Sequence, residues 1–163
     1  MEIRPEAQSD YDTIHALTKT AFAPMAFSDG TEADCIDKLR ADGDLAISLV
    51  AVAGERLTGH VAFSPVYIDE ASSGWFALGP VSVWPEFQKT GIGSALINEG
   101  LAQLKQRSVP GCVLIGDPKY YCRFGFSGDG RLSYRELPKE FVQWISFGDV
   151  RPRGALRFSP GLE

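Results

Sequence analysis

A strand end, a glycine loop and a helix start follow one another in the stretch Val81-Ser82-Val83-Trp84-Pro85-Glu86-Phe87-Gln88-Lys89-Thr90-Gly91-Ile92-Gly93-Ser94. Glycine lets the backbone turn sharply and come close to a ligand. The free N–H groups and the positive dipole end of a helix start attract anions, and Lys89 adds a positive charge beside them. The stretch therefore predicts a site for a phosphate or pyrophosphate group.

Two widespread glycine loops do not match this stretch. The dinucleotide fingerprint needs a third glycine or alanine three residues after the second glycine, but Leu96 occupies that position. The P-loop needs Gly-Lys followed by Ser or Thr, whereas Gly93 is followed by Ser94 and Ala95. A nucleotide-binding module for ATP or NAD is therefore disfavoured. A glycine turn that only lets a helix pack against a strand remains an alternative.

The residues on either side of the glycine loop predict a mixed α/β order. Apolar residues at helical spacing predict a helix over 91–107, and the apolar run 112–115 predicts a strand parallel to the one at 75–84. Gly79-Pro80 interrupts that strand, which predicts a bulge or a splayed ladder because proline donates no hydrogen bond. Further strands are predicted at 2–4, 47–53, 57–68, 141–147 and 155–158, with helices from Ser9 and from Thr31 to Gly43.

Composition and charge limit the class of protein. The 163 residues suit one domain, and 44% hydrophobic with 23% charged residues excludes a disordered or low-complexity chain. The net charge is −5, with 16 Lys plus Arg against 21 Asp plus Glu. Such a field repels nucleic acid and anionic membranes, so neither is expected as a partner. An anionic ligand needs a local site.

Cysteine and histidine content predicts a reducing compartment and no metal centre. Cys35, Cys112 and Cys122 cannot all pair and show no Cys-x-x-Cys spacing. His15 and His60 are the two histidines, and no cluster of metal ligands accompanies them. The chain start lacks the pattern of a signal peptide, and no apolar run reaches the roughly 18 residues of a membrane span. A cytoplasmic location is expected.

Two motifs together resemble the GCN5-related N-acetyltransferase (GNAT) family. Gln88-Lys89-Thr90-Gly91-Ile92-Gly93 is similar to the family's acetyl-CoA signature, although position 89 is commonly glycine there. Downstream, Tyr121 precedes Gly125-Phe126 by four residues, as in many members. The runs Leu78-Gly79-Pro80-Val81 and Gly-Asp-Pro-x-Tyr-Tyr from Gly116 resemble a bacterial subgroup of predicted N-acetyltransferases.

The resemblance implies a fold and an activity. The fold is α/β (α+β), a single domain over 1–163 whose central, mixed, mostly antiparallel twisted sheet is splayed in the middle and carries helices on both faces. The activity is acetyl-CoA-dependent transfer of an acetyl group to the primary amine of a small molecule or peptide, by direct attack in a ternary complex and without metal. The alternative is a CoA-binding sensor without turnover. Members are often homodimers, but no feature of this sequence specifies an interface.

The resemblance also assigns roles to residues of this chain. Backbone groups of Val81 and Val83 pair with the pantetheine arm, N–H groups from Gln88 to Ser94 hold the pyrophosphate, and Tyr121 protonates the departing CoA thiolate. The base is left open: His60 is a candidate, as are Glu32, Asp69, Glu70 and Asp117. The full set expected to bind acetyl-CoA is Val81, Ser82, Val83, Gln88, Lys89, Thr90, Gly91, Ile92, Gly93, Ser94, Asp117 and Tyr120.

An acceptor pocket is expected between the first two helices with their loop on one side and a late strand connection on the other. Aromatic and acidic residues there suit an amine or an amphipathic cation, although packing in the core explains the aromatic residues equally well. The residues expected to line this pocket are Phe22, Met25, Phe27, Asp29, Glu32, Trp144 and Phe147.

Overall fold

Eight strands form one mixed sheet in the computed structural model, which describes residues 1–163. The main order is β1-β2-β3-β4-β5-β7, and β8 pairs with the far end of β3 and with β6. All pairings are antiparallel except β4 with β5 and β6 with β8. The strands are β1 (Glu2–Pro5), β2 (Ile47–Ala53), β3 (Arg56–Ile68), β4 (Ala71–Val83), β5 (Gly111–Ile115), β6 (Leu132–Ser133), β7 (Val142–Ser146) and β8 (Gly154–Phe158).

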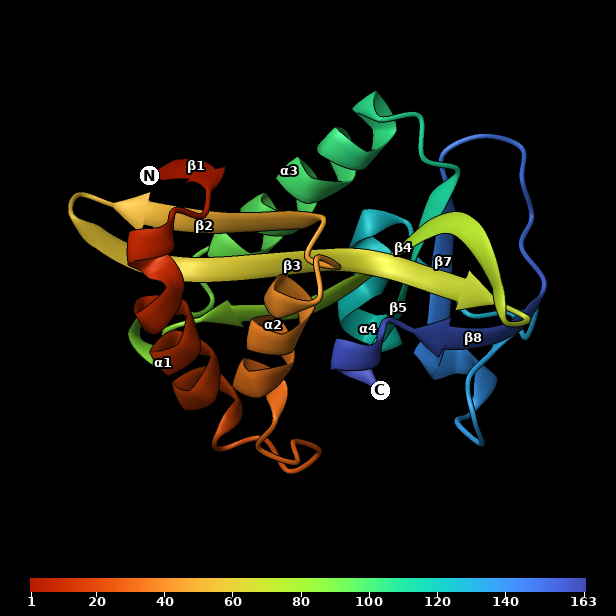
Figure 1. Cartoon of the computed structure of the whole chain (residues 1–163), viewed down its shortest axis with the longest axis horizontal. Coiled ribbons are helices and arrows are strands. Elements are labelled where there is room, and N and C mark those ends of the chain that lie inside the picture. Colours follow the sequence, from red (N-terminus) through yellow and green to blue (C-terminus); the bar gives the residue numbers. More distant parts are fainter.

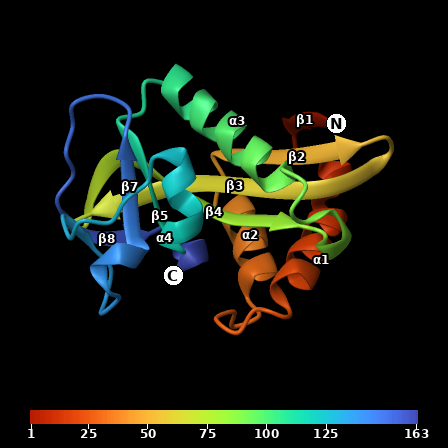
Figure 2. The same cartoon turned by 180° about the vertical axis from the view of Figure 1, so that it is seen from behind.

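Helices cover both faces of the sheet. α1 (Tyr11–Phe22) and α2 (Glu32–Ala41) lie on the face seen in Figure 1, whereas α3 (Ile92–Gln106) and the short α4 (Pro118–Tyr121) lie on the face seen in Figure 2. α3 buries an apolar stripe at helical spacing against the sheet, which includes Leu96, Ile97 and Leu104. No helix of this chain is long and apolar enough to cross a bilayer. The expected mixed sheet with helices on both faces is confirmed.

The sheet opens between β4 and β5. These two strands pair only at Phe76 with Cys112 and at Ala77 with Val113. Beyond that point β4 continues to Val83 with β3 as its partner on one side only. The expected splay in the middle of the sheet is therefore confirmed.

A bulge in β4 accompanies the opening. Val61 pairs with Val81, but Phe63 pairs with Leu78, so Gly79 and Pro80 on β4 stand opposite the single residue Ala62 on β3 and β4 carries one extra residue. Gly79 has φ +136°, in the region that favours glycine, and proline has no N–H to donate to the ladder. The irregular pairing that was predicted from Gly79-Pro80 is confirmed.

The C-terminal part returns to the middle of the molecule. β8 pairs with β3 at Val66, Tyr67 and Ile68, and the last turn, Pro160–Leu162, packs against α2. This return places the C-terminus beside α2 (Figure 1). Two parts of the chain at opposite ends of the sequence thus border the same region.

Candidate active site

A cleft of about 1360 Å³ lies where β4 and β5 separate. Ligand pockets usually measure about 300–1,000 Å³, so this cleft has room for more than one small ligand. A second cavity, of about 300 Å³, lies beside Arg4 and Trp84 and contains none of the predicted site residues. The lining of the larger cleft comes from the α1–α2 segment, β4, the loop before α3, α4 and the C-terminal part of the chain.

The cleft brings together eleven of the fourteen site residues predicted from the sequence. The three that do not line it are His60, Ser82 and Thr90. The eleven that line it are Val81, Val83, Gln88, Lys89, Gly91, Ile92, Gly93, Ser94, Asp117, Tyr120 and Tyr121.

The loop before α3 presents a row of free N–H groups. None of the backbone N–H groups from Lys89 to Ser94 donates to another group of the protein. The N–H of Gln88 does, at 3.3 Å from the carbonyl oxygen of Pro85, so the row begins one residue later than expected. Consecutive free N–H groups at a helix start form an anion site.

The two glycines of the loop differ in what the protein itself requires. Gly91 has φ +90°, a conformation that other residues rarely adopt, and it is the N-cap residue of α3. Gly93 has ordinary helical geometry, and a Cβ there would lie 3.5 Å from the Tyr120 hydroxyl and 3.8 Å from Val83 Cγ2. Folding therefore does not need glycine at 93. A Cβ at that position would instead fill space at the floor of the cleft.

β4 offers backbone groups to the same cleft. The Trp84 N–H donates to the carbonyl oxygen of Thr58 on β3, at 3.1 Å. Because backbone groups alternate in direction along a strand, those of Ser82 also point to β3 and those of Val81 and Val83 point to the opening. The Val83 carbonyl oxygen accepts from the Gln88 side chain at 3.1 Å. The Val81 and Val83 N–H groups thus form a free strand edge.

Tyr121 lies on α4 at the side of the cleft opposite β4. Its ring packs edge-to-face against Tyr120, with centroids 4.9 Å apart, and against Phe126. Gly116 makes room for the ring, since a Cβ there would come within 2.6 Å of Tyr121 Cε2. Burial raises the pKa of Tyr121 to about 12, and the nearby Tyr120 and Asp117 add to the shift. The phenol therefore stays protonated and able to donate a hydrogen bond.

Other polar side chains of the cleft have structural partners. The Asp117 carboxylate caps α4 by accepting from the Lys119 N–H at 2.9 Å. Arg123 stacks on the Tyr120 ring, 4.3 Å from its centroid, and Tyr120 in turn borders Gly93. Lys89 and Arg123 are the two cations that line the cleft, on the loop before α3 and in the turn after α4.

Ser82 and Thr90 take positions that differ from the expectation. Ser82 is 3% exposed and pairs with His60, so its side chain faces the α1 and α2 side of the sheet. The Thr90 hydroxyl donates to the carbonyl oxygen of Phe87, which closes the turn before α3. The Ser82 side chain therefore does not reach the cleft, and the Thr90 side chain shapes the loop instead of lining it.

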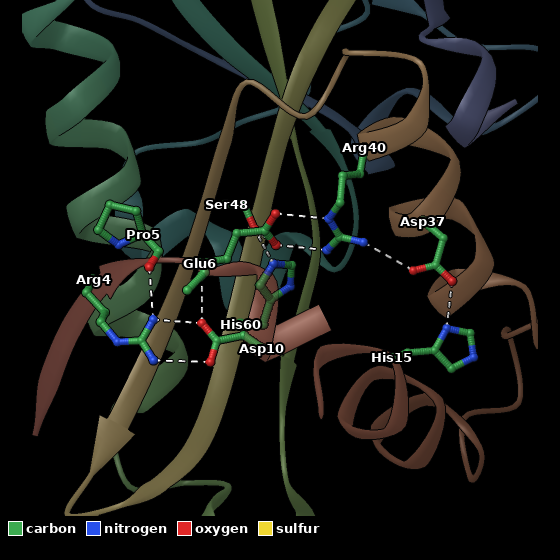
Figure 3. A network of polar contacts seen from close by, with 10 residues as sticks. Arg4, Pro5, Glu6, Asp10, His15, Asp37, Arg40, Ser48 and His60 are labelled. Atoms are coloured by element: carbon green, nitrogen blue, oxygen red, sulfur yellow. Dashed lines mark hydrogen bonds and ion pairs between the residues drawn. The ribbon is translucent and has the colours of Figure 1, made fainter. Parts of the chain in front are cut away.

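His60 also lies outside the cleft, which corrects the expectation that its ring faces the acetyl end. The side chain is fully buried and its Nε2 lies 2.8 Å from Ser48 Oγ (Figure 3). Ser48 donates its proton to Glu6 at 2.7 Å, so the serine oxygen accepts from His60 Nε2–H. Burial lowers the pKa of His60 to about 4, which keeps the ring neutral. The imidazole is part of a buried network on the other face of the sheet.

The carboxylates considered as bases separate into two groups. Asp69 accepts from the Ala155 N–H at 2.8 Å and Glu70 pairs with Arg157 at 2.7 Å, both at the β3–β4 turn and outside the cleft. Glu32 lines the cleft and accepts from the Ser28 hydroxyl at 2.6 Å. Glu32 and the capping Asp117 are therefore the base candidates that remain inside the cleft.

The cleft contains only one side of the pocket that is expected for the acceptor. Trp144 and Phe147 do not line the cleft: Trp144 packs edge-to-face on Trp75 and donates to Asp129, and Phe147 packs under Lys105 of α3. No sequence signal marked the residues that take their place: two of them follow from the pairing of β8 with a distant part of β3, and the other three lie in the connection between β6 and β7. The expected residues that line the cleft are Phe22, Met25, Phe27, Asp29 and Glu32, and those that were missed are Tyr134, Leu137, Phe141, Phe158 and Leu162.

Comparison with known proteins agrees with this geometry. An acetyltransferase (GNAT) domain family matches residues 2–128. The uncharacterized N-acetyltransferase YhbS of Escherichia coli K12 is 36% identical over 127 residues, which cover 77% of this chain and 73% of YhbS. A GNAT acetyltransferase of Brucella melitensis in complex with acetyl-CoA superposes with a TM-score of 0.89 at 42% identity, over 99% of this chain and 97% of that one. The E. coli YhbS structure with CoA gives a TM-score of 0.89 at 29% identity, over 99% and 91%.

Proposed function

Because this chain belongs to the GNAT family of acetyltransferases, we propose that it transfers the acetyl group of acetyl-CoA to a primary amine by direct attack in a ternary complex. The row of free N–H groups from Lys89 to Ser94 is the observation that supports this proposal most strongly. These groups match a pyrophosphate, and the protein leaves them without another partner.

The donor follows the floor of the cleft from this row to the opening of the sheet. The pyrophosphate binds the N–H groups at the start of α3, with Lys89 beside it. The pantetheine arm pairs with the free edge of β4 at Val81 and Val83 as an added strand would. The thioester then lies near Tyr121, and the Val81 N–H polarises its carbonyl oxygen.

The reaction needs few protein groups. The lone pair of the amine nitrogen attacks the thioester carbon, a C–N bond forms and the C–S bond breaks. Tyr121 donates its phenolic proton to the departing CoA sulfur and regains a proton from water. The amine loses its proton to water at the open end of the cleft or to Glu32. Positioning of the two substrates supplies much of the rate enhancement.

A glycine substitution tests the donor site. A Cβ at position 93 meets no obstacle within the protein but occupies the floor of the cleft. We expect Gly93→Ala to fold normally and to weaken acetyl-CoA binding at least about tenfold in titration calorimetry. Gly148→Ala is the matched control, since nothing lies within 4 Å of a Cβ there and the site is outside the cleft.

Binding to NADH and ATP distinguishes the donor from other phosphate-bearing ligands. Selective binding of acetyl-CoA by the wild-type chain, followed by thiol release on addition of amines, supports the proposal. A folded protein that binds no acetyl-CoA would contradict it and would leave Gly91 and Gly93 as parts of a packing turn.

A further inference from the structure

Most of the large hydrophobic side chains that this protein exposes are gathered in the cleft. Seven such side chains are exposed in the whole chain, and the two outside the cleft are Met1 and Val150. Phe27 is 79% exposed. It lies in the segment between α1 and α2, two helices whose apolar residues are buried in the protein core. Exposed apolar residues that cluster in one concave place indicate a ligand surface. The five inside the cleft are Met25, Phe27, Ile115, Leu137 and Phe141.

These side chains form two walls beside the opening of the sheet. One wall is the segment after α1, with Met25 and Phe27 beside Phe22 at the end of that helix, and the other is the C-terminal part, with Leu137 and Phe141. The pyrophosphate loop lies elsewhere, at the start of α3. The two walls therefore belong to the acceptor and not to the charged part of the donor.

The charged residues that line this end of the cleft are both acidic. Asp29 and Glu32 line it, whereas the two cations of the cleft, Lys89 and Arg123, belong to the elements at the α3 end. Hydrogen bonds from the Thr31 hydroxyl and N–H lower the pKa of the Asp29 carboxyl, which keeps it ionised. A cationic acceptor is attracted to this end, and an acceptor with its own carboxylate or phosphate finds no cation among its lining residues, since Arg135 stacks on the Tyr134 ring without lining the cleft.

Building on the proposed function, we infer that the acceptor is a small primary amine attached to an aromatic or alkyl body that has no anionic group. The body packs between the two apolar walls, and Asp29 and Glu32 attract the ammonium form as it enters. A peptide fits less well, because its backbone N–H and C=O groups would face apolar walls without partners.

Matched amines test this inference on the full chain at saturating acetyl-CoA. 2-Phenylethylamine and L-phenylalanine differ by one carboxylate, and ethanolamine keeps the primary amine on a small polar body. We expect kcat/KM for 2-phenylethylamine to exceed that for L-phenylalanine about 100-fold and that for ethanolamine at least about tenfold. n-Hexylamine should behave like 2-phenylethylamine, and Phe-Gly-Gly amide, which keeps the ring without the carboxylate, should be a poorer acceptor.

Two pairs of variants connect the preference to the walls and to the charge. Phe27→Ala should raise KM for 2-phenylethylamine about fivefold without changing acetyl-CoA affinity, whereas Val150→Ala, an exposed apolar residue outside the cleft, should change neither. Asp29→Asn should raise the same KM and reduce its dependence on salt, while Asp149→Asn, at an exposed site outside the cleft, should not.

The outcomes separate this inference from the proposed function. Equal or better use of L-phenylalanine, ethanolamine or the peptide amide would overturn the inference and leave acetyl transfer intact. Acetyl-CoA binding without acetylation of either apolar amine would also overturn it. Absence of acetyl-CoA binding would instead remove the proposed function.

Discussion

Gly91 and Gly93 stand two residues apart and meet different demands. Gly91 supplies a left-handed backbone conformation at the start of α3, which the fold itself requires. Gly93 has no such conformation and leaves space beside Tyr120 and Val83. Lys89 also has a positive φ, of 64°, at the position where the family commonly has glycine. The loop thus keeps its shape with a lysine there and gains a positive charge.

Tyr121 is the residue whose role in the chemistry is tested most directly. We expect Tyr121→Phe to lower kcat for acetyl transfer about 10- to 100-fold, because the departing thiolate loses its proton donor. Acetyl-CoA affinity in titration calorimetry should stay close to that of the wild type. Tyr67→Phe is the control, since Tyr67 lies outside the cleft beside Arg157.

An unchanged kcat in Tyr121→Phe would exclude the phenol as the proton donor. A protein that binds acetyl-CoA selectively and shows no turnover with any amine, before or after the substitution, would favour a CoA-binding sensor instead.

At the scale of elements, small residues set how closely α3 lies on the sheet. A Cβ on Gly100 would overlap the ring of Phe63, and a Cβ on Gly59 would come within 2.9 Å of Ile92 Cγ2. These two glycines lie at the contact between α3 and β3. The close contact fixes the position of the N-terminus of α3 on the sheet. It therefore also fixes where the free N–H groups of this helix start face the cleft.

Substitution at this contact should destabilise the fold. We expect Gly100→Ala to lower the free energy of unfolding by about 1–3 kcal/mol, because the added methyl group overlaps a fully buried aromatic ring. Urea denaturation followed by circular dichroism measures the change. Gly148→Ala adds the same methyl group in open space and should leave the midpoint nearly unchanged. An equal midpoint in Gly100→Ala would mean that α3 can shift away without loss.

Elements with a strong local pattern were predicted well from the sequence, and those defined by pairing were not. The helix expected over 91–107 is α3, and the splay followed correctly from Gly79-Pro80. β4 begins at Ala71 instead of residue 75, because polar residues on a paired hairpin carry no apolar signal. β6 is two residues long and exists only through its pairing with β8. The cleft residues that the sequence did not predict lie in this same C-terminal part.

At the scale of the whole molecule, a buried polar network joins four segments on the face away from the donor loop. Glu6 after β1 pairs with Arg40 of α2 at 2.8 Å and accepts from Ser48 of β2, which contacts His60 of β3 (Figure 3). Burial raises the pKa of Glu6, but the hydrogen bonds from Arg40 and Ser48 outweigh it and leave that pKa lowered. This network stabilises the layer of α1 and α2 that supports one wall of the cleft.

The network predicts how stability depends on pH. His60 has a pKa of about 4 in the folded protein against 6.5 for an ordinary histidine. As the pH falls, the unfolded chain therefore protonates this histidine at a higher pH than the folded protein does. The contribution of neutral His60 to the free energy of unfolding is fully present above about pH 6.5, and roughly 3 kcal/mol of it is lost as the pH drops toward 4. Denaturant titrations across this range measure the slope, and His60→Gln should flatten it.

His15→Gln is the matched control, because His15 is a half-exposed histidine paired with Asp37. Equal slopes in the wild type and in His60→Gln would mean that the buried imidazole does not contribute to acid sensitivity.

The donor half of the site is determined by the sequence alone, because its chemistry is local. A glycine loop, a helix start and a strand end are adjacent in the chain, so the free N–H groups and the β4 edge follow from one stretch of fourteen residues. The half that we propose for the acceptor was decided by tertiary structure. Pairing of β8 with β3 brings Phe158 and Leu162 to the same cleft as Phe22 and Phe27, and strand pairing places the His60 side chain on the other face of the sheet. Contacts between residues so distant in sequence leave no periodic pattern along the chain.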